Sequence, residues 1–226
     1  MKWRYKCMDV ELIGMTKPVV DALEDVADLP AAAAGVCVGK GKSRHGLKVA
    51  LESGHDSVLE HVSFTFRVSG VSRVLLAQLT RHRIASFSVE SQRYVNQAEQ
   101  KIIIPDTIEH NLDAATCYLS ADKMLREAYT YLIEQGVPEE DARYILPAGI
   151  ATTLILTMNV RELRHFFSLR CCNRAQWEIR NLADTMLMIC QREAPELFEN
   201  AGAPCMAGKP CPEMKPCGKP RRKVEE

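Results

Sequence analysis

Residues 62–68 alternate apolar and polar side chains without a break, as Val-Ser-Phe-Thr-Phe-Arg-Val. Side chains two apart lie on the same face of a strand, so this pattern predicts a half-buried β-strand. Gly70 is expected to end the strand, and Ser72 is expected to cap a helix that follows at once. The apolar residues of that helix share one face: Val71, Val74, Leu75 and Leu79.

The rest of the chain mixes strands and helices without a regular βαβ alternation. Two more strands are predicted, at Asp9–Met15 and Thr152–Met158. Further helices are predicted at 18–29, 31–38, 43–52, 112–135 and 138–143. Asn159 and Glu162 fit a capping box at the start of another helix. Asn173 and Gln176 fit a second capping box, at the start of a final helix. This order favours an α+β fold with a mixed or antiparallel sheet and packed helices.

The densest cluster of functional groups is Arg81-His82-Arg83-Ile84-Ala85-Ser86-Phe87-Ser88-Val89-Glu90-Ser91-Gln92-Arg93-Tyr94. Guanidinium groups present a planar fork of donors that matches phosphate or carboxylate, so this cluster indicates an anion site. The alternative is a solvated charged loop. Glu90 is the only acid of the stretch, however, whereas surface ion pairs normally mix signs. Gln78 and Arg81, three apart, are expected to project together from the preceding helix.

Charge balance restricts what this anion can be. Lysine and arginine together number 29, as do aspartate and glutamate, so the net charge is zero. Proteins that coat nucleic acid are usually basic overall, so we expect a small anionic ligand and no nucleic acid. No apolar run approaches about 20 residues, and no signal peptide is apparent, so no membrane is expected. We therefore expect a cytoplasmic protein whose nine cysteines are reduced thiols.

Two further polar groups stand near predicted element ends. The first runs from His55 to His61. These histidines are six apart and share no helical face, so a polar loop at a pocket edge is favoured over a metal site, and no metal is predicted. The second group is Asn159, Arg161, His165 and Arg170. It fits a solvated basic helix face, or a helix N-terminus that binds an anion. Beside residues 81–94, it favours a ligand with more than one phosphate.

Composition changes after Asn200, where proline and cysteine recur as Pro204-Cys205, Pro210-Cys211 and Pro216-Cys217. Such a segment cannot bury a core, so we predict one domain over residues 1–200 and a flexible tail over 201–226. The tail cysteines lack CxxC spacing; free thiols and a zinc site completed by another residue or chain are the alternatives. Cys171-Cys172 beside Arg170 is a candidate activated thiol, although a buried structural thiol is the commoner outcome.

Arg81-His82-Arg83, seven residues and then Ser91 resemble the RHR-x7-S signature of flavin-dependent thymidylate synthases. Further stretches resemble the family in its order: His55–His61, Val137–Arg143 with Leu146-Pro147, Asn159–Arg161 with His165, and Leu169-Arg170 with Ala175–Ile179. The resemblance covers about residues 9–200. It implies an α+β homotetramer that shares active sites between subunits around FAD. It also implies conversion of dUMP to dTMP, with methylenetetrahydrofolate as carbon donor, NADPH as reductant and no covalent cysteine.

The resemblance also implies the site residues. FAD would be bound by Ser57, Glu60, Arg81, His82, Arg83, Asn159, Val160, Arg161 and His165, some of them from neighbouring chains. The dUMP site would comprise Gln78, Arg81, Glu90, Ser91, Gln92, Arg93, Arg143 and Arg170. Arg170 matches the arginine that stabilises charge as uracil N3 ionises, so it is the predicted catalytic residue.

Val89 stands where many family members carry a polar residue, and this leaves a rival reading: a flavoprotein that keeps FAD but has lost synthase activity. Another rival is a nucleic-acid-binding module in which Phe87 and Tyr94 stack on bases. The zero net charge argues against this second rival.

Overall fold

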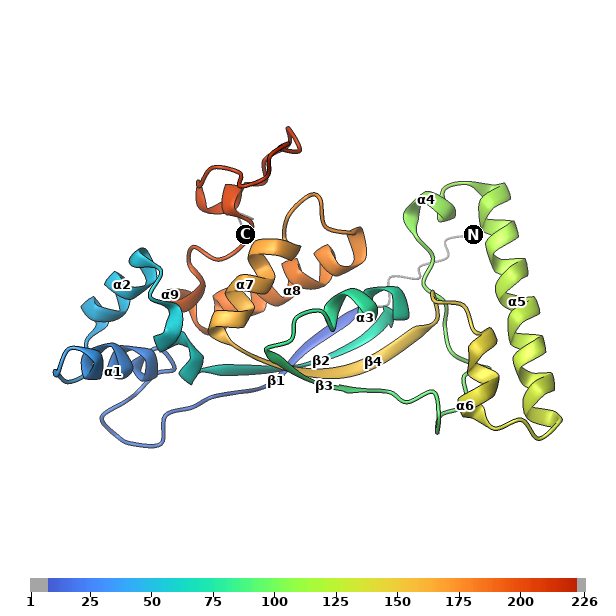
Figure 1. Cartoon of the computed structure of the whole chain (residues 1–226), viewed down its shortest axis with the longest axis horizontal. Helices are drawn as coiled ribbons and strands as arrows, with labels where there is room; N and C mark the ends of the chain where they lie inside the picture. The colour runs from blue at the N-terminus through green and yellow to red at the C-terminus, as the bar shows by residue number, and fades with distance from the viewer. Residues whose placement is uncertain (1–7, 223–226) are drawn as a thin grey trace. The chain divides into compact units, whose positions relative to one another are not determined.

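The structure is a computed structural model that describes residues 8–222, and it contains one four-stranded sheet together with helices (Figure 1). The sheet has the order β1-β2-β4-β3. Its strands are β1 (Asp9–Met15), β2 (Ser63–Ser72), β3 (Ala85–Val89) and β4 (Ala151–Asn159). The helices are α1 (Asp28–Cys37), α2 (Arg44–Ser53), α3 (Arg73–Leu79), α4 (Asp106–Glu109), α5 (Leu112–Glu134), α6 (Glu139–Ala142), α7 (Val160–Arg170), α8 (Trp177–Glu193) and α9 (Pro195–Phe198). Short 3-10 helices are η1 (Asp56–His61), η2 (Arg143–Ile145) and η3 (Pro204–Ala207). The predicted α+β class is confirmed.

The described chain divides into two compact units. Unit 1 comprises residues 8–9, 67–81 and 87–155. Unit 2 comprises residues 10–66, 82–86 and 156–222. The boundary between Arg81 and His82 cuts through the predicted anion-binding cluster.

Unit 1 contains the long helix α5. Asn111 starts this helix, because its side-chain oxygen accepts a hydrogen bond from the amide of Ala114 at 3.0 Å. Tyr129 on α5 is fully buried, and its hydroxyl accepts a hydrogen bond from the amide of Gln97 at 3.3 Å. The connector around Gln97 is therefore tied to α5 by a hydrogen bond in the core.

Unit 2 has an aromatic core. Phe64 of β2 and Phe167 of α7 both pack on Phe198 of α9, with ring centroids 5.6 Å and 6.0 Å apart. All three rings are fully buried, and burying such a side chain contributes about 1.5–3 kcal/mol. This core fixes α7, whose first and last turns carry predicted site residues. In the same unit, α1 and α2 lie side by side (Figure 1).

Most predicted elements are confirmed, but the helix predicted at 18–29 is wrong. Its residues up to Ala27 form turns, and α1 begins only at Asp28. The carboxylates of Asp25 and Asp28 accept hydrogen bonds from the amides of Ala27, Glu24 and Asp25. Such local side-chain bonds compete with helix formation.

Three other boundaries differ from prediction. Gly70 does not end β2, because it adopts a φ of 68°, which glycine tolerates, and the strand continues to Ser72. Gln176, rather than Asn173, caps α8 by accepting from the amides of Glu178 and Ile179. Strand β3 lies inside the cluster of residues 81–94, for which no periodicity was found.

No helix in residues 8–222 is both long enough and apolar enough to cross a membrane.

Candidate functional site

His82 is the buried centre of the arginine cluster. It is 5% exposed, whereas its neighbours Arg81 and Arg83 are exposed. Arg81 lies in the turn after α3, and His82 and Arg83 lie in the connector before β3. Within unit 2, the motif thus buries its imidazole and leaves the guanidinium group of Arg83 exposed.

Both ring nitrogens of His82 have partners within unit 2. Nδ1 lies 3.0 Å from Oε1 of Glu162, and Nε2 accepts a hydrogen bond from Nε of Arg170 at 3.1 Å. Arginine can only donate, so Nε2 must carry the lone pair and Nδ1 the proton. His82 is therefore a neutral imidazole in a fixed tautomer, and it donates to the Glu162 carboxylate.

The electrostatic surroundings agree with this assignment. Burial lowers the pKa of His82, and the nearby Arg170 lowers it further, although Glu162 acts in the opposite direction. Phe166 packs against the imidazole edge-on, with centroids 4.9 Å apart. Burial also lowers the pKa of Arg170, because an apolar setting disfavours the cation. Arg170 is thus a partly desolvated cation held by a neutral acceptor.

The N-terminus of α7 collects a second set of predicted residues. Asn159 accepts a hydrogen bond from the amide of Glu162 at 2.8 Å, which confirms the predicted cap. The other half of the capping box is absent here, because the Glu162 carboxylate bonds His82 instead. Arg161 forms an ion pair with Glu60 of η1, and this hydrogen bond raises the pKa of Arg161. His165 is exposed one turn further on, 6.1 Å from the His82 ring centroid.

Unit 1 holds most of the predicted substrate residues. The carbonyl of Glu90 accepts from Nη2 of Arg73 at 2.7 Å, and its carboxylate accepts from Gln100 at 2.8 Å. Arg93 pairs with Glu140 through Nε at 2.8 Å and Nη2 at 2.7 Å. These contacts hold the segment after β3 in a defined conformation.

Glu140 also contacts Arg143, another residue of the predicted dUMP site. Its carbonyl accepts a hydrogen bond from Nε of Arg143 at 3.0 Å. Arg93 and Arg143 come from segments about 50 residues apart in sequence and meet at α6. At the end of α3, the amide of Arg81 donates to the carbonyl of Gln78 at 3.3 Å. Ser91 accepts from the amide of Arg93 at 3.2 Å, in the turn that also contains Gln92.

The structure thus groups the predicted residues within two units. Unit 2 brings together His82, Arg170, His165 and the pair Glu60–Arg161, and unit 1 brings together Arg93 and Arg143. Sequence reasoning missed three residues that hold these groups: Arg73, Glu140 and the Glu162 carboxylate as a partner of His82. The sequence indicates both acids only as parts of helix starts: Glu162 in a capping box, and Glu140 in the first turn after Pro138.

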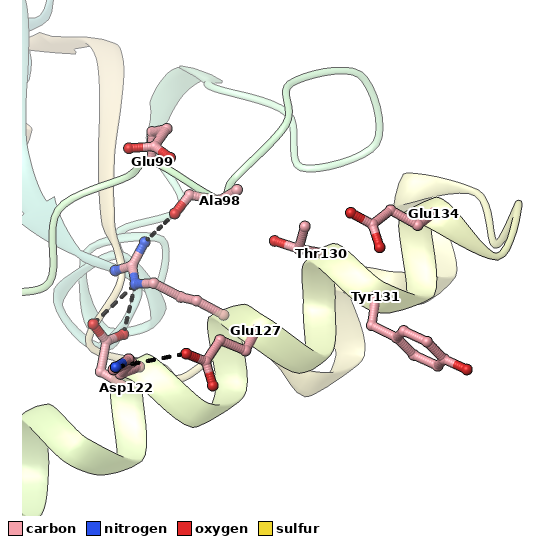
Figure 2. Close-up of a pocket in the computed structure, with 9 residues that line it drawn as sticks. Ala98, Glu99, Asp122, Glu127, Thr130, Tyr131 and Glu134 are labelled. Atoms are coloured by element: carbon pink, nitrogen blue, oxygen red, sulfur yellow. Dashed lines mark hydrogen bonds and ion pairs between the residues drawn. The ribbon is translucent and has the colours of Figure 1, made fainter.

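Hollows in the described part of the chain include one in each unit. One, of about 600 Å³ in unit 2, is lined mainly by apolar side chains and borders Ser57 and His61. The other, of about 480 Å³ in unit 1, lies along α5 and contains none of the predicted residues. Figure 2 shows the carboxylates of Asp122, Glu127 and Glu134 on its α5 wall, with Ala98 and Glu99 on the opposite side.

No group of three metal-ligating side chains gathers among residues 8–222. Cys171 is buried, and burial together with the neighbouring Asp184 raises its thiol pKa. A raised pKa disfavours the thiolate, so Cys171 matches a structural thiol rather than a nucleophile.

Comparisons with a family model and with known proteins point to the same family. Residues 18–196 match the family described as thymidylate synthase complementing protein. The chain is 49% identical to the flavin-dependent thymidylate synthase of Geobacter sulfurreducens over 168 residues, 74% of this chain and 72% of that protein. It is 49% identical to the enzyme of the same name from Nitratidesulfovibrio vulgaris, over 69% of this chain and 66% of that protein. The Clostridium tetani enzyme of this name is 43% identical, over 71% of each chain.

Proposed function

The chain belongs to the flavin-dependent thymidylate synthase family, and on this premise we propose that it converts dUMP to dTMP. Methylenetetrahydrofolate would supply the carbon, and NADPH would reduce the bound FAD. The observation that carries the proposal is the hydrogen bond from Arg170 to the neutral His82. It holds a desolvated cation in one orientation, as electrostatic catalysis requires.

The exposed groups of unit 2 fit FAD. A flavin dinucleotide has a diphosphate, which favours guanidinium donors and helix N-termini, and ribityl and ribose hydroxyls, which favour carboxylates and hydroxyls. Arg83 and Arg161 are exposed guanidinium donors for the diphosphate, and the exposed imidazole of His165 is a further donor. Ser57 and Glu60, also exposed, supply a hydroxyl and a carboxylate for the sugar hydroxyls. When bound, the flavin supplies the hydride chemistry.

We assign His82 a different role from its exposed neighbours. Its two ring nitrogens are engaged by Glu162 and Arg170, so its side chain positions Arg170 rather than contacting FAD through a ring nitrogen. The FAD contact implied for this position by the family resemblance would then come from its backbone. Asn159 is engaged in the cap of α7, so it too would act by ordering the helix N-terminus.

Arg170 would hold negative charge that develops on the uracil as N3 loses its proton. A guanidinium fixed before the reaction stabilises that charge without reorganisation. Arg93 and Arg143, with Gln78, Arg81, Glu90, Ser91 and Gln92, would bind dUMP, with the arginines at its phosphate. We further propose a homotetramer whose active sites draw residues from more than one chain.

We also propose one catalytic domain over residues 1–200, followed by a C-terminal segment that hydrogen-bonds to it. We propose a cytoplasmic location, where the free cysteines would stay reduced.

Purified protein tests these assignments. We expect a yellow protein that forms dTMP from dUMP, methylenetetrahydrofolate and NADPH. Arg170→Ala should lower kcat by about 10²–10³-fold while FAD stays bound. The exposed Arg192→Ala on α8 is the matched control and should behave like wild type. A protein that binds FAD but makes no dTMP would favour the flavoprotein without synthase activity. Loss of FAD in Arg170→Ala would show that Arg170 binds FAD, which contradicts its proposed role at the uracil.

A further inference from the structure

The C-terminal segment after α9 is bound to the junction between α7 and α8 by a series of hydrogen bonds. We call residues 204–222 the C-terminal strap; they lie outside the residues that match the family. Asn173 donates to the carbonyl of Lys219 at 2.6 Å, and Arg174 donates to the carbonyl of Lys215. Both donors stand within four residues of Arg170, and all of these residues belong to unit 2.

Arg221 makes a partly buried contact between the strap and the rest of unit 2. Its Nη1 donates to the carbonyl of Cys171 at 2.6 Å and pairs with Oδ1 of Asp184 at 2.7 Å. The side chains of Arg221 and Asp184 are only 19% and 23% exposed, so this ion pair is shielded from solvent more than most surface pairs. The hydrogen bond to Asp184 raises the pKa of Arg221, which keeps the cation charged.

The carbonyl of Cys171, which Arg221 contacts, lies at the C-terminal end of α7. Cys171 is the C-cap of α7, and the last carbonyls of a helix have no partner within it. A cation at this end satisfies the carbonyl and interacts favourably with the helix dipole. Arg221 therefore fastens the end of α7 to Asp184 of α8, immediately after Arg170.

We propose that the C-terminal strap is a positioning device for Arg170, and that Arg221 is its main positioning residue. Nε of Arg170 donates to Nε2 of His82 at 3.1 Å, and the backbone of Arg170 is the last residue of α7. Releasing the Cys171 carbonyl would let that turn fray and would loosen the direction of the guanidinium. A misplacement of about 1 Å in a reacting geometry can cost on the order of 10²-fold in rate.

This inference rests on the proposed function, and the test separates the two. Arg221→Ala and a chain that stops after Pro220 should each lower kcat for dTMP formation about 5- to 20-fold. FAD content and the KM for dUMP should stay near wild type, because only the transition-state contact is weakened. The exposed neighbour Arg222→Ala is the matched control and should keep wild-type kcat.

A second measurement does not depend on turnover. Amide hydrogen exchange in the peptide spanning 168–176 should become faster in Arg221→Ala and in the shortened chain, and should not change in Arg222→Ala. If wild type makes no dTMP, the proposed function fails while this exchange result still tests the strap. Should Arg221→Ala not fold, Asp184→Asn weakens the hold on Arg221 from α8 and should give the same two effects in smaller measure, because Arg221 can still donate to the Cys171 carbonyl.

A double mutant decides whether Arg221 acts through Arg170. In an Arg170→Ala background, Arg221→Ala should lower kcat no further, since the group it positions is gone. Unchanged kcat and unchanged exchange in the Arg221→Ala protein would overturn the proposal. So would a loss of kcat that is as large in the Arg170→Ala background as in wild type.

Discussion

Nε of Arg170 donates to Nε2 of His82 at 3.1 Å, and this contact fixes the protonation state of the histidine. Since the guanidinium cannot accept, the imidazole must be neutral, with its proton on Nδ1 directed at Glu162. A carboxylate, an imidazole and a guanidinium thus form a chain of hydrogen bonds from α7 through residue 82 and back to α7. The conspicuous RHR motif contributes its middle residue to the interior, where it holds a cation that lies 88 residues away in sequence.

Glu162→Ala should lower kcat about 10- to 100-fold, the range seen when a residue that orients a functional group is lost. Without the carboxylate, His82 can move its proton to Nε2, where it opposes the donor of Arg170. Glu162→Gln keeps an acceptor for Nδ1–H and should retain most of the activity. Steady-state kinetics of the two variants check this, and equal losses in both would count against control of the tautomer.

His82 should make stability fall at acid pH. Its pKa is lowered from about 6.5 by burial and by Arg170, with His165 acting the same way and Glu162 opposing. Between 6.5 and the lower folded value, the unfolded chain binds more protons than the folded one. The stabilising contribution is therefore complete above pH 6.5 and is lost as the pH falls through that window.

Urea midpoints at pH 7.5 and 5.5 measure this effect. Wild type should lose more stability over this range than His82→Gln, which has no imidazole to protonate. The prediction fails if the two proteins show the same pH dependence.

Asp28 should be an acid-sensitive anchor of α1. Burial acts to raise its pKa, but two backbone amides and the cations of Lys42 and Arg44 lower it to about 2. Asp28→Asn should cost about 1–3 kcal/mol of unfolding free energy at pH 7, because buried donors lose a charged acceptor. The contribution of a carboxylate with a lowered pKa is complete above its ordinary value of 3.8 and is lost as the pH falls toward 2. Urea unfolding at pH 7 and pH 3 measures both effects, with the exposed Asp21→Asn as control.

Arg93→Ala should raise the KM for dUMP about tenfold or more, because a charge-assisted hydrogen bond to phosphate contributes about 1.5–3 kcal/mol. Arg93 is held by Glu140, so little further ordering of its side chain would be needed on binding. Deoxyuridine, which lacks the phosphate, should bind both proteins equally weakly. The exposed Arg67→Ala in the same unit is the control. A KM for dUMP that stays at the wild-type value in Arg93→Ala would remove Arg93 from the phosphate site.

Sequence patterns predicted the regular elements well wherever local chemistry decides them. The alternation at 62–68 placed β2, and the side chains of Ser72, Ser43 and Asn159 cap helices because each accepts from the amide three residues later. The helix predicted at 18–29 failed because Asp25 and Asp28 offered the same backbone amides a competing partner.

The family signature is likewise readable from the sequence, since residue order alone carries the RHR-x7-S motif and the segments around 55–61 and 159–179. Sequence by itself therefore determined the family and the α+β class, and it supplied the site residues that we propose. Only tertiary structure decided what those residues do for one another. Glu162 is a helix cap by spacing but a partner of His82 in space, and Arg221 stands in a Pro-Cys tail yet holds the carbonyl next to Arg170. Such contacts join segments about 50–90 residues apart, and no local propensity records them, because they form only when the aromatic core fixes α7.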